Sequence, residues 1–176
     1  MEFYYRMFDD CSYCITYYKG NTNQVIIPER LNVTILFDGL FKGHTEITSV
    51  NIPTSITDIG GFVFDGCSNL RTLQLPSNLA NMWQYALTRC GIESIIIPGS
   101  VTSIVPFTFY QCKKLKTVRF SEGTKRICSW AFKDCIELHD VYLSSSIMDI
   151  SNDAFDGCEN VTLHNPKEFR LRNSAL

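Results

Sequence analysis

Hydrophobic positions recur along this chain with a period of about 23 residues. The clearest is a bulky apolar residue, here termed the marker residue, at Phe41, Phe64, Leu87, Phe109, Phe132 and Phe155. The steps between these positions are 23, 23, 22, 23 and 23 residues. Three positions after the marker, the first copy has His44 and the other five have Cys67, Cys90, Cys112, Cys135 and Cys158. A register kept over six copies predicts a repeat architecture.

Each copy has the same internal order of apolar, polar and turn-forming residues. It begins with a short alternating segment, such as Leu73–Leu75 or Val118–Phe120, whose period of two predicts a half-buried strand. In three copies a proline follows, eleven residues before the marker, at Pro53, Pro76 and Pro98. Proline ends a strand because it has no N–H to donate. The segment from proline to marker is too short for a stable helix, so we expect one helical or 3₁₀ turn at most.

A unit of this length cannot bury its own apolar face, so neighbouring copies must stack to form a core. Stacking places equivalent residues about 4.8 Å apart. The sequence therefore predicts a parallel ladder of short strands, with a line of marker rings and a line of cysteines along the axis.

The repeated pattern (L)xxVxIPxSITxIGxxAFxxC resembles the BspA-like leucine-rich repeats, and Ile47–Cys67 and Ile92–Cys112 fit it most closely. This chain departs from it at Gly91, where one residue is missing, and at Ser121, Thr124 and Ser144. The resemblance implies an α/β, β-rich solenoid with the strand ladder on its concave face. Loops and short 3₁₀ or helical turns would form the convex side. Relatives include surface proteins and adhesins of bacteria and of parasitic protists, which implies protein binding.

We expect three regions along the chain. Residues 24–163 hold about six repeats of 22–25 residues. Residues 1–23 are aromatic but lack the full pattern, so they form an N-terminal cap or a degenerate first turn. Residues 164–176 form a C-terminal tail or cap. The last strand falls near Val161–Leu163, but its register is open by two residues.

Eight cysteines raise the questions of disulfide bonds and of metal binding. Stacked cysteines would have Cβ atoms about 4.8 Å apart, whereas a disulfide needs about 3.8 Å. Free thiols acting as small apolar fillers are therefore expected. Cys11 and Cys14 form a CxxC, but a zinc site needs a second ligand pair. His44, His139 and His164 do not have that spacing, so we expect no metal, and the role of the CxxC stays open.

Composition and motifs argue against several classes of function. With 16 basic and 18 acidic residues, the chain carries no positive field for nucleic acid. It has no glycine-rich phosphate loop, and buried thiols are inert, so we expect neither an enzyme nor a cofactor. No membrane span or signal peptide is visible, which predicts a cytoplasmic protein. The alternative is a cell-surface location, if the chain is a fragment of a longer adhesin-like protein.

Outward-pointing strand residues should line up in a stripe of Ile26, Asn51, Gln74, Ile96, Arg119 and Tyr142. Ile96, Arg119 and Tyr142 are consecutive in it and combine apolar, cationic and aromatic groups, a composition enriched at binding hot spots. These three residues, with Gln74 and Asn51, are the predicted contact site for a protein partner. The alternative function is self-association into a homo-oligomer, through the solenoid ends or through this patch.

Overall fold

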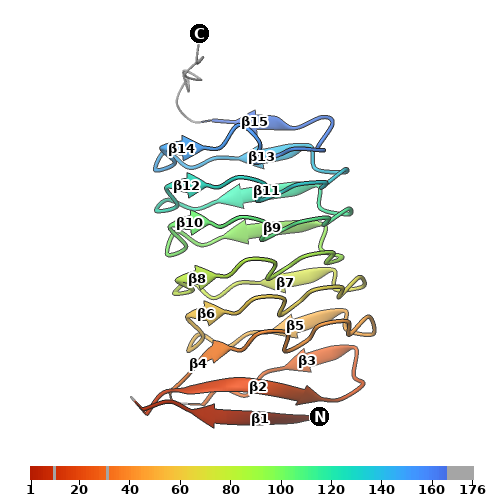
Figure 1. Cartoon of the computed structure of the whole chain (residues 1–176), viewed down its shortest axis with the longest axis vertical. Helices are drawn as coiled ribbons and strands as arrows, with labels where there is room; N and C mark the ends of the chain where they lie inside the picture. The colour runs from red at the N-terminus through yellow and green to blue at the C-terminus, as the bar shows by residue number, and fades with distance from the viewer. Residues whose placement is uncertain (10, 31, 166–176) are drawn as a thin grey trace.

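The computed structural model describes residues 1–9, 11–30 and 32–165. Within these ranges every regular element is a β-strand, and the strands belong to coils stacked in one column (Figure 1). An N-terminal hairpin lies at one end of the column and β15 at the other. The stacked solenoid predicted from the repeat is confirmed.

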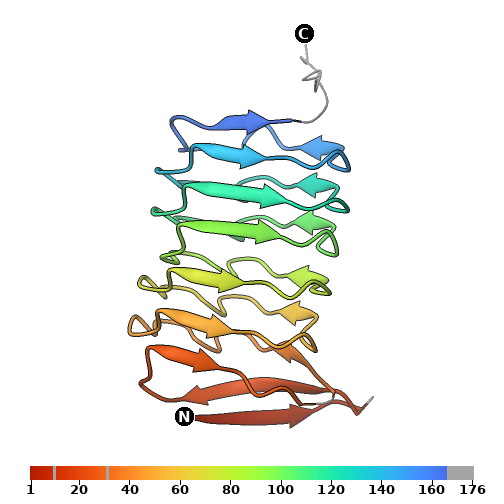
Figure 2. The ribbon, with the colours of Figure 1, turned by 180° about the vertical axis from the view of Figure 1, so that it is seen from behind.

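One strand from each coil joins what we term the long-strand ladder, seen face-on in Figure 2. All its pairs are parallel, and equivalent residues of successive copies lie side by side, as Val50 does with Leu73 and Val118 with Val141. Its strands are β3 (Gln24–Ile26), β5 (Ser49–Asn51), β7 (Thr72–Gln74), β9 (Ser94–Ile97), β11 (Thr117–Phe120), β13 (Asp140–Tyr142) and β15 (Thr162–His164). This is the ladder that the alternating segments predict.

A second set of parallel strands, the short-strand ladder, follows the proline positions. Its members are β4 (Val33–Leu36), β6 (Asp58–Ile59), β8 (Asn81–Met82), β10 (Ser103–Ile104), β12 (Arg126–Ile127) and β14 (Asp149–Ile150). Most have two residues, of which the second faces the core, as Ile59 and Ile104 do. The sequence pattern did not predict that these residues would pair.

The chain between the short strand and the cysteine forms hydrogen-bonded turns, and the helical or 3₁₀ turn expected between proline and marker is absent from the described residues. The backbone explains the difference. Phe62 and Gly66 have φ values of 58° and 76°, and Tyr85 and Arg89 have 62° and 53°. Single turns close between these residues, as when Asp65 N–H donates to the Phe62 carbonyl at 3.1 Å, but two left-handed residues four positions apart do not allow a continuous right-handed helix.

The marker residues form the predicted line through the core. Phe109 stacks on Phe132 with ring centroids 4.9 Å apart, and Phe132 stacks on Phe155 at 5.3 Å. Phe41 and Phe64 stack at 5.5 Å in the first two copies.

The cysteines form a second line, also as predicted. Sγ of Cys67 donates to the carbonyl of Phe41 at 3.0 Å, and Sγ of Cys135 donates to that of Phe109, also at 3.0 Å. Cys112 and Cys158 make the same bond, so four of the five thiols in the line bond the marker residue of the preceding coil. Burial raises the pKa of Cys67 to about 12, so this thiol stays protonated at neutral pH.

Both ladders are interrupted at one place, which we term the seam. Within the described ranges, no ladder pair joins β7 to β9 or β8 to β10, and the gap is visible in Figure 1. The seam coincides with the missing residue at Gly91, whose N–H donates to Cys67 across it at 3.1 Å. A Cβ on Gly91 would lie 2.1 Å from the carbonyl oxygen of Ser68, so only glycine fits this close approach. The turns stay joined, since Leu87 N–H donates to Thr108 at 3.0 Å.

Within residues 1–23 lies an antiparallel hairpin of β1 (Glu2–Met7) and β2 (Tyr13–Lys19). β2 also runs parallel to β4, which attaches the hairpin to the short-strand ladder. The buried ring of Tyr18 covers the end of the marker line, 5.2 Å from Phe41 and 5.1 Å from His44. At the other terminus, the tail expected for residues 164–176 lies outside the described residues from 166 onward.

Candidate protein-interaction surface

The predicted contact residues lie on the outer face of the long-strand ladder. Asn51 and Gln74 are paired in the sheet before the seam, and Ile96, Arg119 and Tyr142 are paired in the sheet after it. The Ile96 side chain is 63% exposed, and Tyr142 is half-buried. The seam separates the stripe into two groups, because Gln74 and Ile96 do not form a ladder pair in the described structure.

Arg119 and Tyr142 hold one another in place. The guanidinium carbon of Arg119 lies 3.7 Å from the centroid of the Tyr142 ring, which is a close cation–π contact. The opposite face of that ring stacks on His164, with centroids 4.4 Å apart and planes 12° apart. Tyr142 is therefore fixed between a cation and an imidazole. The column of Ile96, Arg119 and Tyr142 thus extends by one residue, His164, which was not among the five predicted contact residues.

Sequence reasoning missed His164 because the register of the last strand was open. The structure pairs Tyr142 with His164 and Asp140 with Thr162, so β15 places His164 in the stripe. The available signal was the alternation of Thr162, Leu163 and His164, which fits the register adopted.

A carboxylate at the edge of the patch orients this imidazole. Oδ1 of Asp140 lies 2.5 Å from Nε2 of His164, and its Oδ2 lies 2.8 Å from Nδ1 of His139. Hydrogen bonds from His164 and then His139 lower the pKa of the Asp140 carboxyl. Asp140 is thus an anion at neutral pH, so the outer face presents the Arg119 cation on β11 and the Asp140 anion on the adjacent strand β13.

Beside the patch is an open groove of about 520 Å³. It crosses the seam and is lined by β7, β9 and β11, through Thr72, Gln74, Ser94, Ile96, Thr117 and Arg119. Hydroxyl and amide groups surround one exposed isoleucine and one guanidinium. A groove of this composition offers an apolar contact with hydrogen-bonding groups around it.

The turns carry a second aromatic column that sequence reasoning also missed. Each ring stacks on the next, with centroid distances of 4.9, 5.0 and 5.3 Å, through Phe62, Tyr85, Phe107 and Trp130. The signal was an aromatic residue two positions before the marker in four consecutive copies. Because the rings cover one another's faces, mostly their edges are presented outward.

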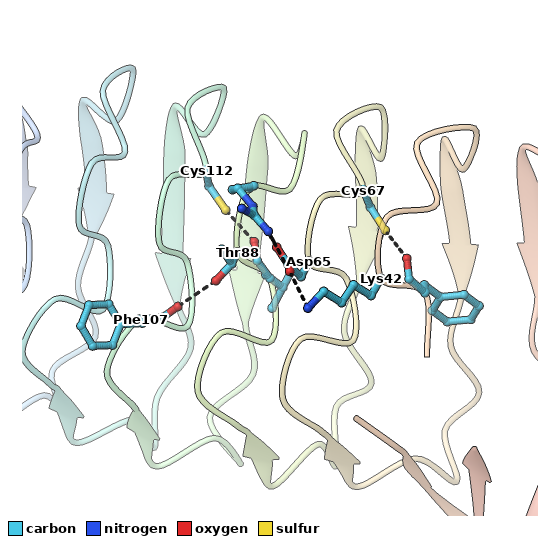
Figure 3. A network of polar contacts seen from close by, with 9 residues as sticks. Lys42, Asp65, Cys67, Thr88, Phe107 and Cys112 are labelled. Carbon is cyan, nitrogen blue, oxygen red and sulfur yellow. Dashed lines mark hydrogen bonds and ion pairs between the residues drawn. The ribbon is translucent and has the colours of Figure 1, made fainter. Parts of the chain in front are cut away.

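A buried carboxylate joins three coils on the same side (Figure 3). Asp65 is 1% exposed, and Arg89 from the next coil bonds both of its oxygens, with Nη2 at 2.7 Å and 2.9 Å. Lys42 from the preceding coil lies 3.5 Å from Oδ2. The cluster links three coils, because cations from both neighbouring coils form ion pairs with the Asp65 carboxylate.

No group of three or more His, Cys, Asp or Glu side chains in the described part of the chain could hold a metal ion. The two thiols of the CxxC are in different environments. Cys11 is exposed, whereas Cys14 is buried in β2 with its Sγ 3.7 Å from the Arg6 carbonyl.

Repeats of this length, stacked in this way, match a known family. A sequence model of the BspA type leucine rich repeat region matches residues 34–162, in six copies. This chain belongs to the BspA-type leucine-rich-repeat family. Its fold is the leucine-rich-repeat solenoid that the resemblance implied. No curated protein gives a significant sequence match to this BspA-type protein.

Solved structures of leucine-rich-repeat proteins have a similar fold. The leucine-rich-repeat protein TpLRR of T. pallidum superposes with a TM-score of 0.76 at 28% identity, over 85% of this chain and 79% of that one. A leucine rich cell surface protein of Faecalibacterium prausnitzii gives 0.65 at 22% identity, over 94% of this chain and 53% of that one. A leucine-rich-repeat protein of Bacteroides ovatus gives 0.67 at 21%, over 93% and 52%. The BspA-type chain thus spans about half the length of the last two.

Among the described residues of this BspA-type protein, no helix is long and apolar enough to cross a membrane.

Proposed function

We propose that this protein is a non-enzymatic recognition module that binds a protein partner on the outer, concave face of the long-strand ladder. The observation that carries the proposal is the continuous column of Ile96, Arg119, Tyr142 and His164 on four paired strands. An exposed isoleucine beside a cation–π pair is the composition found at interface hot spots. Membership in a leucine-rich-repeat family supports a scaffold role.

The geometry also supports binding with little loss of side-chain freedom. Arg119 already lies on Tyr142, and Tyr142 already lies on His164. A partner therefore meets side chains that do not need to be ordered on contact, which lowers the entropic cost of association. The adjoining groove provides space for a side chain of the partner next to Ile96.

The proposal allows two locations, the cytoplasm and, as the alternative, the cell surface. The F. prausnitzii structure of similar fold is described as a cell surface protein. Surface labelling of intact source cells with an antibody to this chain distinguishes the two locations.

The proposal is tested by changing the patch while keeping the fold. A variant with Arg119→Glu and Tyr142→Ala should melt at nearly the wild-type temperature, because Arg119 is exposed and Tyr142 only half-buried. We expect its affinity for the partner isolated by a wild-type pull-down to fall roughly thirtyfold or more, as for a hot-spot loss of about 2 kcal/mol.

The matched control carries Arg126→Glu and Tyr110→Ala, which change the same residue types away from the patch. It should capture the partner as the wild type does. Unaltered capture by the patch variant would reject this site.

A further inference from the structure

The outer edge of β1 is an unpaired strand edge at one end of the solenoid. β1 pairs with β2 on one side, and no described strand lies on its other side (Figure 1). Such an edge presents N–H and C=O groups that can pair with another strand.

The contacts of β1 show which of its backbone groups face outward. The Tyr4 carbonyl accepts from Oγ1 of Thr16 at 3.3 Å, and the Arg6 carbonyl accepts from Sγ of Cys14 at 3.7 Å. Both donors belong to β2, so the backbone groups of Tyr4 and Arg6 face β2. The hairpin register shifts between Tyr4 and Tyr5, but the extra residue, Thr16, lies in β2, so hydrogen-bonding direction still alternates along β1. Phe3 and Tyr5 therefore turn their N–H and C=O groups toward the open edge.

We propose that two copies of this chain join edge to edge through β1, antiparallel, with the two-fold axis at Tyr4. Phe3 of one copy then lies opposite Tyr5 of the other, and their outward backbone groups exchange hydrogen bonds. The sheet of β1, β2, β4, β6 and β8 continues across the axis into the second copy. The contact is self-complementary, as a two-fold interface must be.

Charge selects both the partner and the register. The exposed side chains of Glu2, Tyr4 and Arg6 alternate with half-buried ones, so they lie on one face of β1. In the register centred on Tyr4, each Glu2 lies opposite Arg6 of the second copy, which makes two ion pairs. A slip of two residues in either direction loses both pairs. Opposite charges directly across an antiparallel pair are favourable.

The exposed aromatic residues near this edge also favour pairing through β1. The Tyr4 side chain is 48% exposed and that of Tyr17 on β2 is 57% exposed, and their rings lie 5.5 Å apart. Around the two-fold axis, the Tyr4 rings of both copies meet between the two Tyr17 rings. Pairing through β1 thus covers apolar surface that a single chain leaves in water.

The test is charge reversal followed by mixing, read by light scattering on the full chain with any tag at its C-terminus. The wild type should reach twice the chain mass of 20.1 kDa as its concentration rises. Glu2→Arg alone and Arg6→Glu alone place like charges opposite one another, so each should associate at least tenfold more weakly. An equimolar mixture of the two variants should regain wild-type association, because each strand then faces two charges of opposite sign.

Three controls keep the result specific. Lys113→Glu reverses an exposed charge away from β1 and should associate like the wild type. Far-ultraviolet circular dichroism checks that the two β1 variants, both changed at exposed positions, still fold. The variant with Arg119→Glu and Tyr142→Ala should also associate normally, which separates this proposal from the one on partner binding. A wild type that stays monomeric at the highest concentration, or one whose association neither reversal weakens, would overturn the proposal.

Discussion

Phe132 shows how much a single residue contributes to the stacked core. Its ring is fully buried between Phe109 and Phe155, and the Phe120 ring packs against it at 86°, with ring centroids 6.5 Å apart. Phe132→Ala removes a ring from a line whose neighbours are fixed by their own coils. We expect the free energy of unfolding in urea to fall by about 3–5 kcal/mol. Met148→Ala, at a side chain 68% exposed, should change it by less than about 0.5 kcal/mol. A loss below about 1 kcal/mol for Phe132→Ala would contradict the stacked core.

The thiols should differ in reactivity according to their exposure. The thiolate is the reactive form, and at pH 8 a pKa of about 12 leaves Cys67 as thiolate in about one molecule in ten thousand. Burial also raises the pKa values of Cys90 and Cys135. With Ellman's reagent, exposed Cys11 should react at once, and these three buried thiols should react only after unfolding. Half-buried Cys128 and Cys158 should react in the native protein as well, and a hydrogen bond with Cys135 lowers the pKa of Cys158. Cys11→Ser should therefore remove one thiol per chain from the fast phase. Prompt reaction of the buried thiols in the native protein would show that the line is accessible.

For single residues, the sequence predicted which side chains form the core. It did not predict the backbone conformation of the stacked aromatic residues in the turns. The markers and cysteines could be predicted because each slot repeats a residue type at a fixed step. The left-handed conformations of Phe62 and Tyr85 could not, since such positions normally hold glycine or asparagine. Packing of each ring on its neighbours stabilises what the local residue type disfavours.

Among the elements, the seam is where we expect the backbone to open most easily. Past the seam, Thr117 N–H donates to the carbonyl of Glu93, and Arg126 N–H donates to that of Thr102. Ser94 and Ser103 occupy the same positions at the seam, and among the described residues neither amide donates such a bond to the preceding coil. In native-state hydrogen exchange, the amides of Ser94 and Ser103 should therefore exchange faster than those of Thr117 and Arg126. Equal protection would mean that the two ladders are continuous in solution.

The strands themselves were predictable to different degrees. The long strands have three or four residues with alternating apolar positions, which a period of two identifies. The short strands have mostly two residues, such as Asp58–Ile59, and two residues cannot display a period. Their pairing follows from the stacking of whole coils rather than from any local signal. The missing residue at Gly91 marked the seam in the sequence. It did not show that the strands on either side would fail to pair, which depends on how the two coils pack.

For the whole molecule, the seam divides the solenoid into two blocks, one on each side of it. Stability in a repeat protein is close to a sum over coils and the interfaces between them, so a weak interface allows the blocks to unfold separately. The two tryptophans report on the two blocks, since Trp83 lies before the seam and Trp130 after it. Single-tryptophan variants, made by Trp83→Phe and Trp130→Phe, should give urea transitions with different midpoints.

Circular dichroism on both variants is the control, because it should show the same overall transition in each. Coincident fluorescence midpoints would mean that the joined turns and the core hold the molecule as one cooperative unit.

The architecture and the candidate surface were largely predictable at this scale, because stacking converts a sequence step into a spatial column. The ends were not. Residues 1–23 carry no full repeat, so the pattern did not predict that Glu2–Met7 and Tyr13–Lys19 would form an antiparallel hairpin. At the other end, the register of the last strand was open by two residues, so the sequence did not predict that His164 would join the site.

The spacing of the four paired strands that carry Ile96, Arg119, Tyr142 and His164 also sets the length of a ligand that can contact all four side chains. Three strand spacings of about 4.8 Å make a footprint roughly 14 Å long. An extended peptide advances about 3.3 Å per residue, so a strand-like ligand lying along this column would meet the four side chains with four or five of its residues. Ligands shortened below that length should lose contacts one coil at a time.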